Sequence, residues 1–215
     1  MSWIMSGKSR DRSDVRAAAC ALIAIKAREH CKSRLAEVLT PAARLQLVRA
    51  MLEAVISAAR SAQTLRQILV VSPERDCVAA EIPVLADTGG GLNGALSAAQ
   101  MALHEFGCQE LVVLPADLPH VTATDIDELV RSGRKGGFAI APDAAGVGTN
   151  ALYLGSSQPF RFRFGPDSRR LHVEQAHSMG LNPQVVQLAG LEFDVDSPDD
   201  VRRLEEPSWR TCRQA

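Results

Sequence analysis

The chain of 215 residues has a formal net charge of −1, with 46% apolar and 23% charged residues. These values are ordinary for one globular domain with a buried core. The near-neutral charge argues against a nucleic-acid-binding surface, and aromatic residues, at 4%, are too few for base-stacking platforms. We predict a disordered polar arm over residues 1–17, a domain over 18–206 and a tail over 207–215.

The start of the chain is too polar for a signal peptide, and no apolar run approaches the ~20 residues of a membrane span. We therefore expect a cytoplasmic protein with no membrane segment. The cysteines are odd in number and no pair has the close spacing of a zinc site, so we expect reduced, mostly buried thiols. They are Cys20, Cys31, Cys77, Cys108 and Cys212.

The first half of the chain alternates apolar runs with helical patterns. A buried strand is predicted over 19–25. A helix follows from Thr40-Pro41, because Thr is a good N-cap and Pro is tolerated at the first helical position. Apolar residues at helical spacing extend it to Ala59. Strands are predicted over 68–72 and 82–86, and a helix over 92–106 that Gly107 ends.

The second half continues the alternation. Strands are predicted over 111–114, 138–141, 151–154, 185–188 and 193–196. A helix capped by Thr122 or Thr124 ends at Gly133, and another spans 167–179. Ser197 caps the last helix, whose first turn carries acids that the helix dipole favours.

The predicted strands are continuous apolar runs, which is typical of strands buried on both faces of a parallel sheet. Their alternation with helices predicts a doubly wound α/β sandwich, a Rossmann-like single domain with a mostly parallel central sheet. In open sheets of this kind ligands bind at the carboxyl ends of the strands. A ligand site is therefore expected in the loops that follow the strands.

A basic loop follows the first predicted strand. Lys26, Arg28, Lys32 and Arg34 lie within nine residues, and such charge suits phosphate groups. The alternative is a solvated basic loop. No Walker A pattern is present, so a P-loop enzyme is excluded.

A glycine-rich loop, residues 87–95, precedes the helix predicted over 92–106. Glycine lets a backbone approach a ligand closely, and helix N-termini attract anions or polar groups. An ordinary flexible turn is an equally good interpretation.

Acidic residues follow two other strands. Asp117 lies in a Pro-Ala-Asp-Leu-Pro turn, where a carboxylate can bind magnesium or simply bond its own backbone. Asp194 and Asp196 are two residues apart and therefore lie on the same face of the strand predicted there. Asp117 with one of them could hold a metal, although Asp196 could instead support the following helix cap. The five histidines show no ligand spacing, and we interpret them as structural or exposed; they are His30, His104, His120, His172 and His177.

Six motifs occur in an order that resembles the 2-phospho-L-lactate guanylyltransferase family of coenzyme F(420) biosynthesis. The likeness covers about residues 19–206. The motifs are Ile25-Lys26 with Lys32-Ser33-Arg34-Leu35, Gly91-Leu92-Asn93, Pro115-Ala116-Asp117-Leu118-Pro119, Gly148-Thr149-Asn150-Ala151-Leu152, Phe164-Gly165-Pro166-Asp167-Ser168 and Asp194-Val195-Asp196-Ser197-Pro198. One departure is Val147, where the family usually has a threonine.

The resemblance implies a GT-A-type nucleotidyltransferase that joins GTP to a small phosphorylated carboxylic acid and releases pyrophosphate. The acid is 2-phospho-L-lactate, phosphoenolpyruvate or 3-phospho-D-glycerate, and the sequence does not select among them. Expected metal ligands for Mg²⁺ are Asp117 and Asp196. Expected acceptor contacts are Thr149, Gly165 and Ser168. Expected phosphate contacts are Lys26, Lys32 and Arg34, and expected nucleotide contacts are Gly90, Gly91, Leu92 and Asn93.

Alternatives are a molybdopterin or sugar-phosphate nucleotidyltransferase of the same fold, or a non-catalytic nucleotide-binding module. The first two carry a glycine-rich loop directly after the first strand, where this chain has basic residues. The sequence does not determine the oligomeric state, and a homodimer is the state that we consider.

Overall fold

The computed structural model describes residues 18–25, 32–74, 78, 81–86, 90–155 and 158–204. Its centre is a seven-stranded sheet with the order β3-β2-β1-β4-β6-β5-β7. The strands are β1 (Ala19–Ala24), β2 (Leu65–Ser72), β3 (Val84–Ala86), β4 (Leu111–Pro115), β5 (Gly137–Pro142), β6 (Thr149–Leu154) and β7 (Asn182–Val185). The helices are η3 (Ser33–Glu37), α1 (Pro41–Ser61), α2 (Gly91–Glu105), α3 (Ala123–Arg134), α4 (Ser168–Ser178), α5 (Ala189–Glu192) and α6 (Pro198–Arg203).

The sheet is mixed but mostly parallel, which confirms the predicted α/β class. Strand β1 pairs in parallel with β2 and β4, β2 with β3, and β5 with β7. Strand β6 is antiparallel to both of its neighbours, β4 and β5. It follows β5 after a short turn, and such a connection favours an antiparallel pair. As a result β6 begins at the edge of the sheet where β1 and β4 end.

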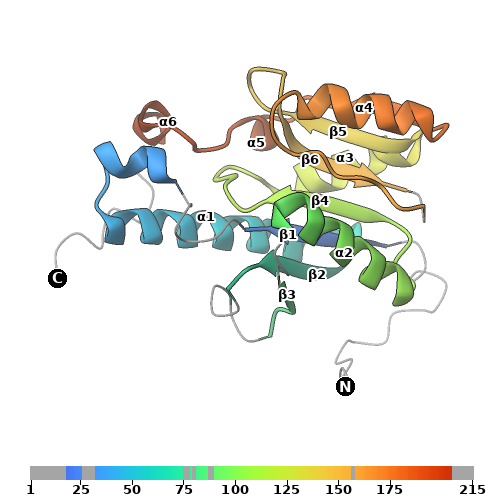
Figure 1. Ribbon diagram of the computed structural model, residues 1–215, viewed down its shortest axis with the longest axis horizontal. Coiled ribbons are helices and arrows are strands. Elements are labelled where there is room, and N and C mark those ends of the chain that lie inside the picture. Colours follow the sequence, from blue (N-terminus) through green and yellow to red (C-terminus); the bar gives the residue numbers. More distant parts are fainter. Residues whose placement is uncertain are drawn as a thin grey trace.

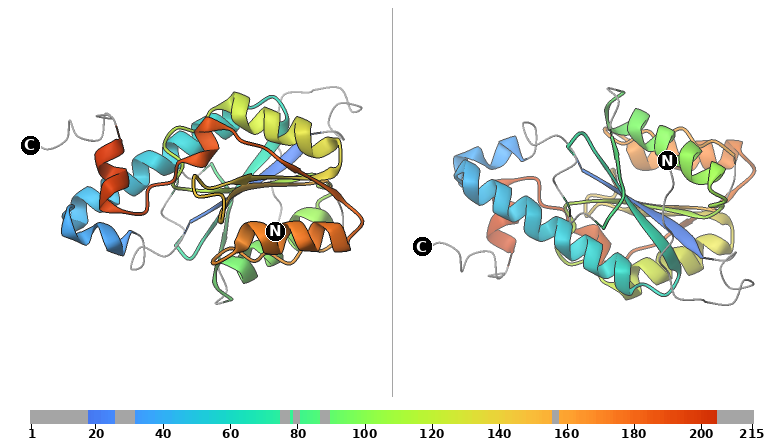
Figure 2. Two further views of the ribbon diagram at one scale, coloured as in Figure 1. Left: turned by 90° about the horizontal axis from the view of Figure 1, so that it is seen from above. Right: turned by 90° about the horizontal axis from the view of Figure 1, so that it is seen from below.

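Helices cover both faces of the sheet. Figure 2 shows α1 and α3 on one face and α2 and α4 on the other. Successive strand residues point to opposite faces, so Ile23 joins the core under α1 and α3, whereas Leu22 joins the core under α2 and α4. Burial on both faces explains why the central strands have apolar runs without polar alternation.

A third, smaller apolar cluster joins η3 and α6 to the first turns of α1. Its buried members include Leu35, Leu47, Met51, Val195 and Val201. Figure 1 shows η3 and α6 together near the end of α1 that lies away from the sheet. This cluster fixes the segments that carry Lys32 and Asp196 relative to each other.

Capping side chains begin three of the helices. Thr40 accepts a hydrogen bond from the backbone N–H of Ala43 at 3.2 Å, as predicted. Helix α3 is capped by Thr122 rather than Thr124, in a capping box with Asp125. Ser197 forms the equivalent box at α6 with Asp200.

The last predicted strands were placed wrongly. Strand β7 covers Asn182–Val185 and not 185–188, and residues 193–196 form no strand. The apolar side chains of Val186 and Leu188 pack onto the core from a loop, which imitates a strand pattern. Helices η3 and α5 were not predicted, because a short helix offers too little periodicity.

The expectation of reduced thiols is wrong for one pair. A disulfide joins Cys20 of β1 to Cys108, 88 residues further along the chain. Strands β1 and β4 are neighbours, and the N–H of Cys20 donates to the carbonyl of Glu110 at 2.8 Å, which brings the two cysteines together. This proximity depends on strand order and not on sequence spacing.

The expectations for the two ends of the chain are untested. The predicted arm and tail lie outside the described residues. None of the described helices combines the length and apolar character needed to cross a bilayer.

Candidate active site

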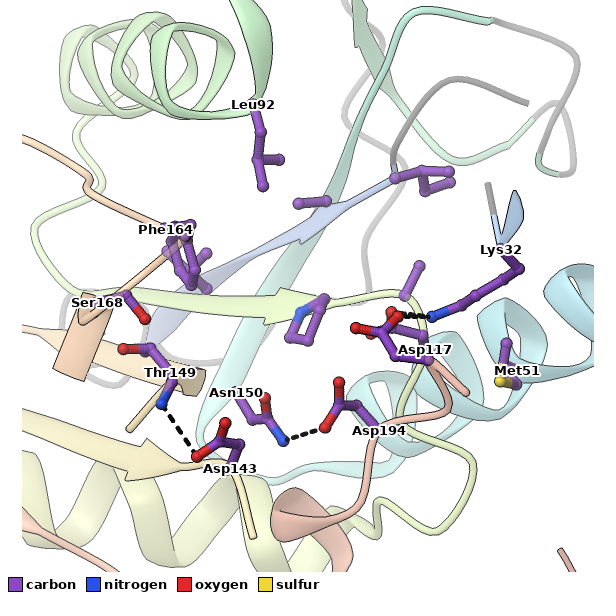
Figure 3. A pocket seen from close by; sticks show the side chains of 18 of the residues that line it. Lys32, Met51, Leu92, Asp117, Asp143, Thr149, Asn150, Phe164, Ser168 and Asp194 are labelled. Atoms are coloured by element: carbon purple, nitrogen blue, oxygen red, sulfur yellow. Dashed lines mark hydrogen bonds and ion pairs between the residues drawn. The ribbon is translucent and has the colours of Figure 1, made fainter. Parts of the chain in front are cut away.

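A cavity of about 710 Å³ lies at the edge of the sheet where β1 and β4 end and β6 begins. This is the edge at which the predicted sheet type binds its ligands. Figure 3 shows Lys32 and Asp117 at one end of the cavity, Phe164, Thr149 and Ser168 at the other, and Asp194 between them. The antiparallel β6 allows the start of one strand to face the ends of two others.

Three carboxylates meet in this cavity. Asp117 follows β4, and Asp194 and Asp196 lie between α5 and α6. One oxygen from each lies within 4.8 Å of the others. The Nδ2 of Asn150 donates to the Leu191 carbonyl at 2.9 Å and to Asp194 Oδ1 at 3.3 Å. Asn150 therefore ties the segment that carries two of the acids to the start of β6.

Lys32 lies against the acids. Its Nζ is 2.5 Å from Asp117 Oδ2 and 2.8 Å from Asp196 Oδ1, and its side chain is only 6% exposed. Burial by itself would lower the pKa of Lys32, but the charges and hydrogen bonds of Asp117 and Asp196 outweigh it and raise the pKa. The ammonium therefore stays charged and offsets part of the negative charge of the cluster.

The chemistry of this cluster fits a hard divalent cation. Burial, followed by the charges of Asp117 and Asp196, raises the pKa of Asp194. Three carboxylates lie beside the one ammonium of Lys32, so negative charge exceeds positive charge in the cluster. Magnesium prefers carboxylate oxygens and is usually bound through one or two carboxylates plus substrate phosphates. The three acids thus supply suitable ligands, with Asp194 joining the pair expected from the sequence.

The opposite end of the cavity is lined by two buried hydroxyl groups. Thr149 is 8% exposed at the start of β6, and Ser168 is 2% exposed in the first turn of α4. Gly165, with φ +130°, lies in the loop before α4 and also lines the cavity. These groups can donate hydrogen bonds to an anion.

A hydrogen-bonded turn presents Thr149. Asp143 Oδ1 accepts from the N–H groups of Val147 at 2.9 Å and Gly148 at 3.0 Å. A Cβ on Gly148 would lie 2.6 Å from Asp143 Oδ2, so a larger residue there would push aside the carboxylate that holds the turn. Arg169 of α4 donates to the Gly146 carbonyl at 2.8 Å, which fastens the turn to the helix.

Most of the residues expected from the sequence line this cavity. They are Lys32, Arg34, Leu92, Asp117, Thr149, Gly165, Ser168 and Asp196. Gly90 and Gly91 form the start of α2 and are not among the lining residues. Asn93 links its amide to the backbone of Phe164, at 3.1 Å and 2.8 Å, so the structure gives it a supporting role. Its contact with a nucleotide stays a prediction, and Lys26 lies outside the described residues.

Sequence reasoning gave no role to several lining residues. Asn150 stands in a motif used for the resemblance, and a polar residue directly before a buried apolar run was the available signal. Phe164 also stands in one of these motifs, whereas Asp143 carried no signal, because its place depends on the turn before β6.

Comparisons with known proteins show what this chain is similar to. Residues 19–205 match the model of the family described as "Guanylyl transferase CofC like". A phosphoenolpyruvate guanylyltransferase from Rubrobacter xylanophilus is 39% identical over 191 residues, covering 86% of this chain and 92% of that protein. One from Chloroflexus aggregans is 38% identical over 189 residues, covering 84% and 94%.

Solved structures share the fold at low identity. A candidate nucleotide-diphospho-sugar transferase from Desulfovibrio desulfuricans G20 superposes with a TM-score of 0.73 at 18% identity, covering 89% of this chain and 90% of that one. A CMP:2-keto-3-deoxy-manno-octonic acid synthetase has a TM-score of 0.57 at 13% identity, covering 86% and 96%. The predicted GT-A-type fold and family resemblance are confirmed. The chain belongs to the CofC-like guanylyl transferase family and is a nucleotidyltransferase.

Proposed function

We propose that this protein transfers the guanylyl group of GTP to a phosphorylated three-carbon acid, as a step in coenzyme F(420) biosynthesis. The observation that carries the proposal is one cavity with two chemically different ends. Three carboxylates and Lys32 form one end, and the buried hydroxyls of Thr149 and Ser168 form the other. Such a cavity suits a nucleoside triphosphate with a divalent cation beside a second, smaller anion.

Phosphoenolpyruvate is the acceptor that we favour over 3-phospho-D-glycerate and 2-phospho-L-lactate. Relatives at 38–39% identity bear the name phosphoenolpyruvate guanylyltransferase. The three acids share a carboxylate and a phosphate, so the hydroxyl-lined end of the cavity suits each of them in charge.

In the proposed reaction a phosphate oxygen of the acid attacks the α-phosphorus of GTP in line. A new P–O bond forms, the bond to the β-phosphate oxygen breaks, and pyrophosphate leaves with the bonding electrons. A phosphate monoester is already nucleophilic near neutral pH, so the protein needs no general base. Its tasks are positioning and stabilisation of charge.

We propose Asp117, Asp194 and Asp196 as the ligands of Mg²⁺. Magnesium held by these carboxylates would supply positive charge that offsets the negative charge developing on the triphosphate. Lys32 lies against the same carboxylates and can share its N–H groups with a phosphate oxygen. Arg34 is exposed at the cavity wall, and in this proposal it would contact the outer phosphates.

We assign the acceptor to the opposite end. Thr149 and Ser168 would donate to its carboxylate or phosphate, beside the loop at Gly165. The family departure at Val147 is compatible with this assignment, because the Val147 side chain is 53% exposed and its contribution to the turn is a backbone N–H.

Mass spectrometry of reaction products tests the proposal. The protein would be incubated with Mg²⁺ and GTP and with each of the three acids in turn, with ATP and CTP as control donors. We expect a guanosine diphosphate diester of phosphoenolpyruvate and an equal amount of pyrophosphate. Folded protein that forms no diester with any of the acids, or that prefers ATP or CTP, would contradict it.

A further inference from the structure

We propose that His172 is a positioning residue, which fixes the Thr149 hydroxyl as a hydrogen-bond donor toward an anionic oxygen of the acceptor. This inference rests on the function proposed above. His172 lies on α4, is 0% exposed and does not line the cavity itself. Its ring lies in the core against those of Phe160 and Phe164, with centroids at 5.7 Å and 5.0 Å, and hydrogen bonds at both of its nitrogens set its orientation.

The backbone determines which ring nitrogen carries the proton. The N–H of Arg163 donates to Nε2 of His172 at 2.9 Å. A backbone N–H can only donate, so Nε2 must accept and carries no hydrogen. The proton of the neutral imidazole therefore lies on Nδ1, which is 3.1 Å from Thr149 Oγ1.

This tautomer decides how Thr149 behaves. The Nδ1–H group donates to Thr149 Oγ1, so the single hydrogen of the hydroxyl cannot point at His172. It is left to donate elsewhere, and Thr149 lines the cavity. With the other tautomer the hydroxyl would donate to the ring, and two N–H groups would face each other at Nε2.

The neutral state of the ring is protected by its surroundings. Burial and the positive charge of Arg163 lower the pKa of His172 to about 4. A proton on Nε2 would also face the N–H of Arg163. His172 therefore keeps Thr149 in the donor state throughout the neutral pH range, which is the state that an anion requires.

The position of Thr149 predicts which substrate is affected. Figure 3 shows Thr149 beside Ser168 and Phe164, at the end of the cavity away from Lys32 and Asp117. Loss of the His172 hydrogen bond should therefore weaken use of the acid and leave use of GTP unchanged. A histidine that served only packing would lower stability without separating the two substrates.

Long-range ¹H–¹⁵N NMR of the histidine-labelled protein tests the tautomer. We expect His172 to carry its proton on Nδ1 at neutral pH. A proton on Nε2, or on both nitrogens, would overturn the inference. This measurement needs no turnover, so it decides the inference even if the protein transfers no guanylyl group, a result that would defeat the proposed function separately.

Kinetics test the consequence. His172→Leu should raise the KM for phosphoenolpyruvate about tenfold and change the KM for GTP less than about twofold. His172→Asn, whose amide can donate from near the Nδ1 position, should lie closer to wild type. In a Thr149→Val background, His172→Leu should add little.

Phe160→Leu is the matched control, because it alters packing beside His172 and leaves both hydrogen bonds in place. We expect a lower melting temperature with an unchanged KM for the acid. The inference is wrong if Phe160→Leu raises that KM as much as His172→Leu, or if His172→Leu raises the KM for GTP equally.

Discussion

Lys32 shows how a buried charge is held at this site. Its ammonium contacts two carboxylates, and their attraction outweighs the unfavourable burial. Removing the Lys32 ammonium would take a hydrogen-bond donor from the proposed phosphate site. It would also leave more of the negative charge of the carboxylates uncompensated. Both effects disfavour a triphosphate, so they act in the same direction.

We predict that Lys32→Met raises the KM for GTP at least about tenfold. The matched control is Lys135→Met, because Lys135 is exposed at the end of α3 and does not line the cavity. Steady-state kinetics with phosphoenolpyruvate held saturating measure both variants. An unchanged KM and turnover for Lys32→Met would remove Lys32 from the phosphate site.

His172 also predicts a pH dependence of stability. Its pKa is about 4 in the folded protein, against about 6.5 for an exposed histidine. Between these values the unfolded chain binds the proton more readily, so the neutral histidine makes stability fall as pH falls from 6.5 toward 4. From pH 7 to 5 this amounts to about 2 kcal/mol.

Urea unfolding at pH 7 and pH 5 measures this loss. The wild type should lose about 2 kcal/mol more than His172→Leu over that interval, because the variant has no proton to gain there. Equal losses in the two proteins would show that His172 titrates normally.

At the scale of elements, capping chemistry determines where α3 begins. The sequence offered Thr122 or Thr124, and the structure selects Thr122, whose hydroxyl accepts from the N–H of Asp125 at 3.2 Å. Asp125 Oδ2 in turn accepts from the N–H of Thr122 at 2.9 Å. The first N–H groups of any helix lack partners within the helix, and this cap supplies partners for those at the start of α3.

Thr122→Ala should lower the free energy of unfolding by about 1 kcal/mol. Thr124→Ala is the control, and it should change stability by no more than a few tenths of a kcal/mol, because alanine is favoured inside a helix. Thermal unfolding distinguishes the two. A larger loss from Thr124→Ala would mean that the helix begins elsewhere.

The elements differ in how well the sequence predicted them. Strand β1 and helix α1 were placed to within one or two residues, because a continuous apolar run and a regular 3.6-residue period are local signals. Strand β7 was placed incorrectly, because it is an edge strand of four residues with little burial. The direction of β6 was also not evident, because pairing direction depends on the turn that precedes it.

The same division applies to the site. Asp117 and Lys32 were predicted because each follows a buried strand or stands in a motif. The hydrogen bonds that hold the site together were not predicted. Asn150 reaches Asp194 across 44 residues, and His172 reaches Thr149 across 23. Such contacts are set by the order of strands and helices, which local patterns do not contain.

At the scale of the whole molecule, the mixed sheet explains how one cavity acquires two kinds of chemistry. The ends of β1 and β4 provide the positions next to Lys32 and Asp117, and the reversed β6 brings Thr149 to the same edge. A fully parallel sheet would place the start of that strand at the opposite edge. The reversal thus brings the hydroxyl groups at the start of β6 into the same cavity as the carboxylate cluster.

In the proposed function, guanylyl transfer in this cavity depends on the carboxylate cluster at Asp117. The most direct measurement is the turnover of Asp117→Asn with GTP and phosphoenolpyruvate, together with Mn²⁺ binding by electron paramagnetic resonance. We predict a fall in kcat of about 100-fold or more and weaker Mn²⁺ binding, with circular dichroism and melting temperature close to wild type. A folded variant with near-normal turnover and Mn²⁺ affinity would contradict the account.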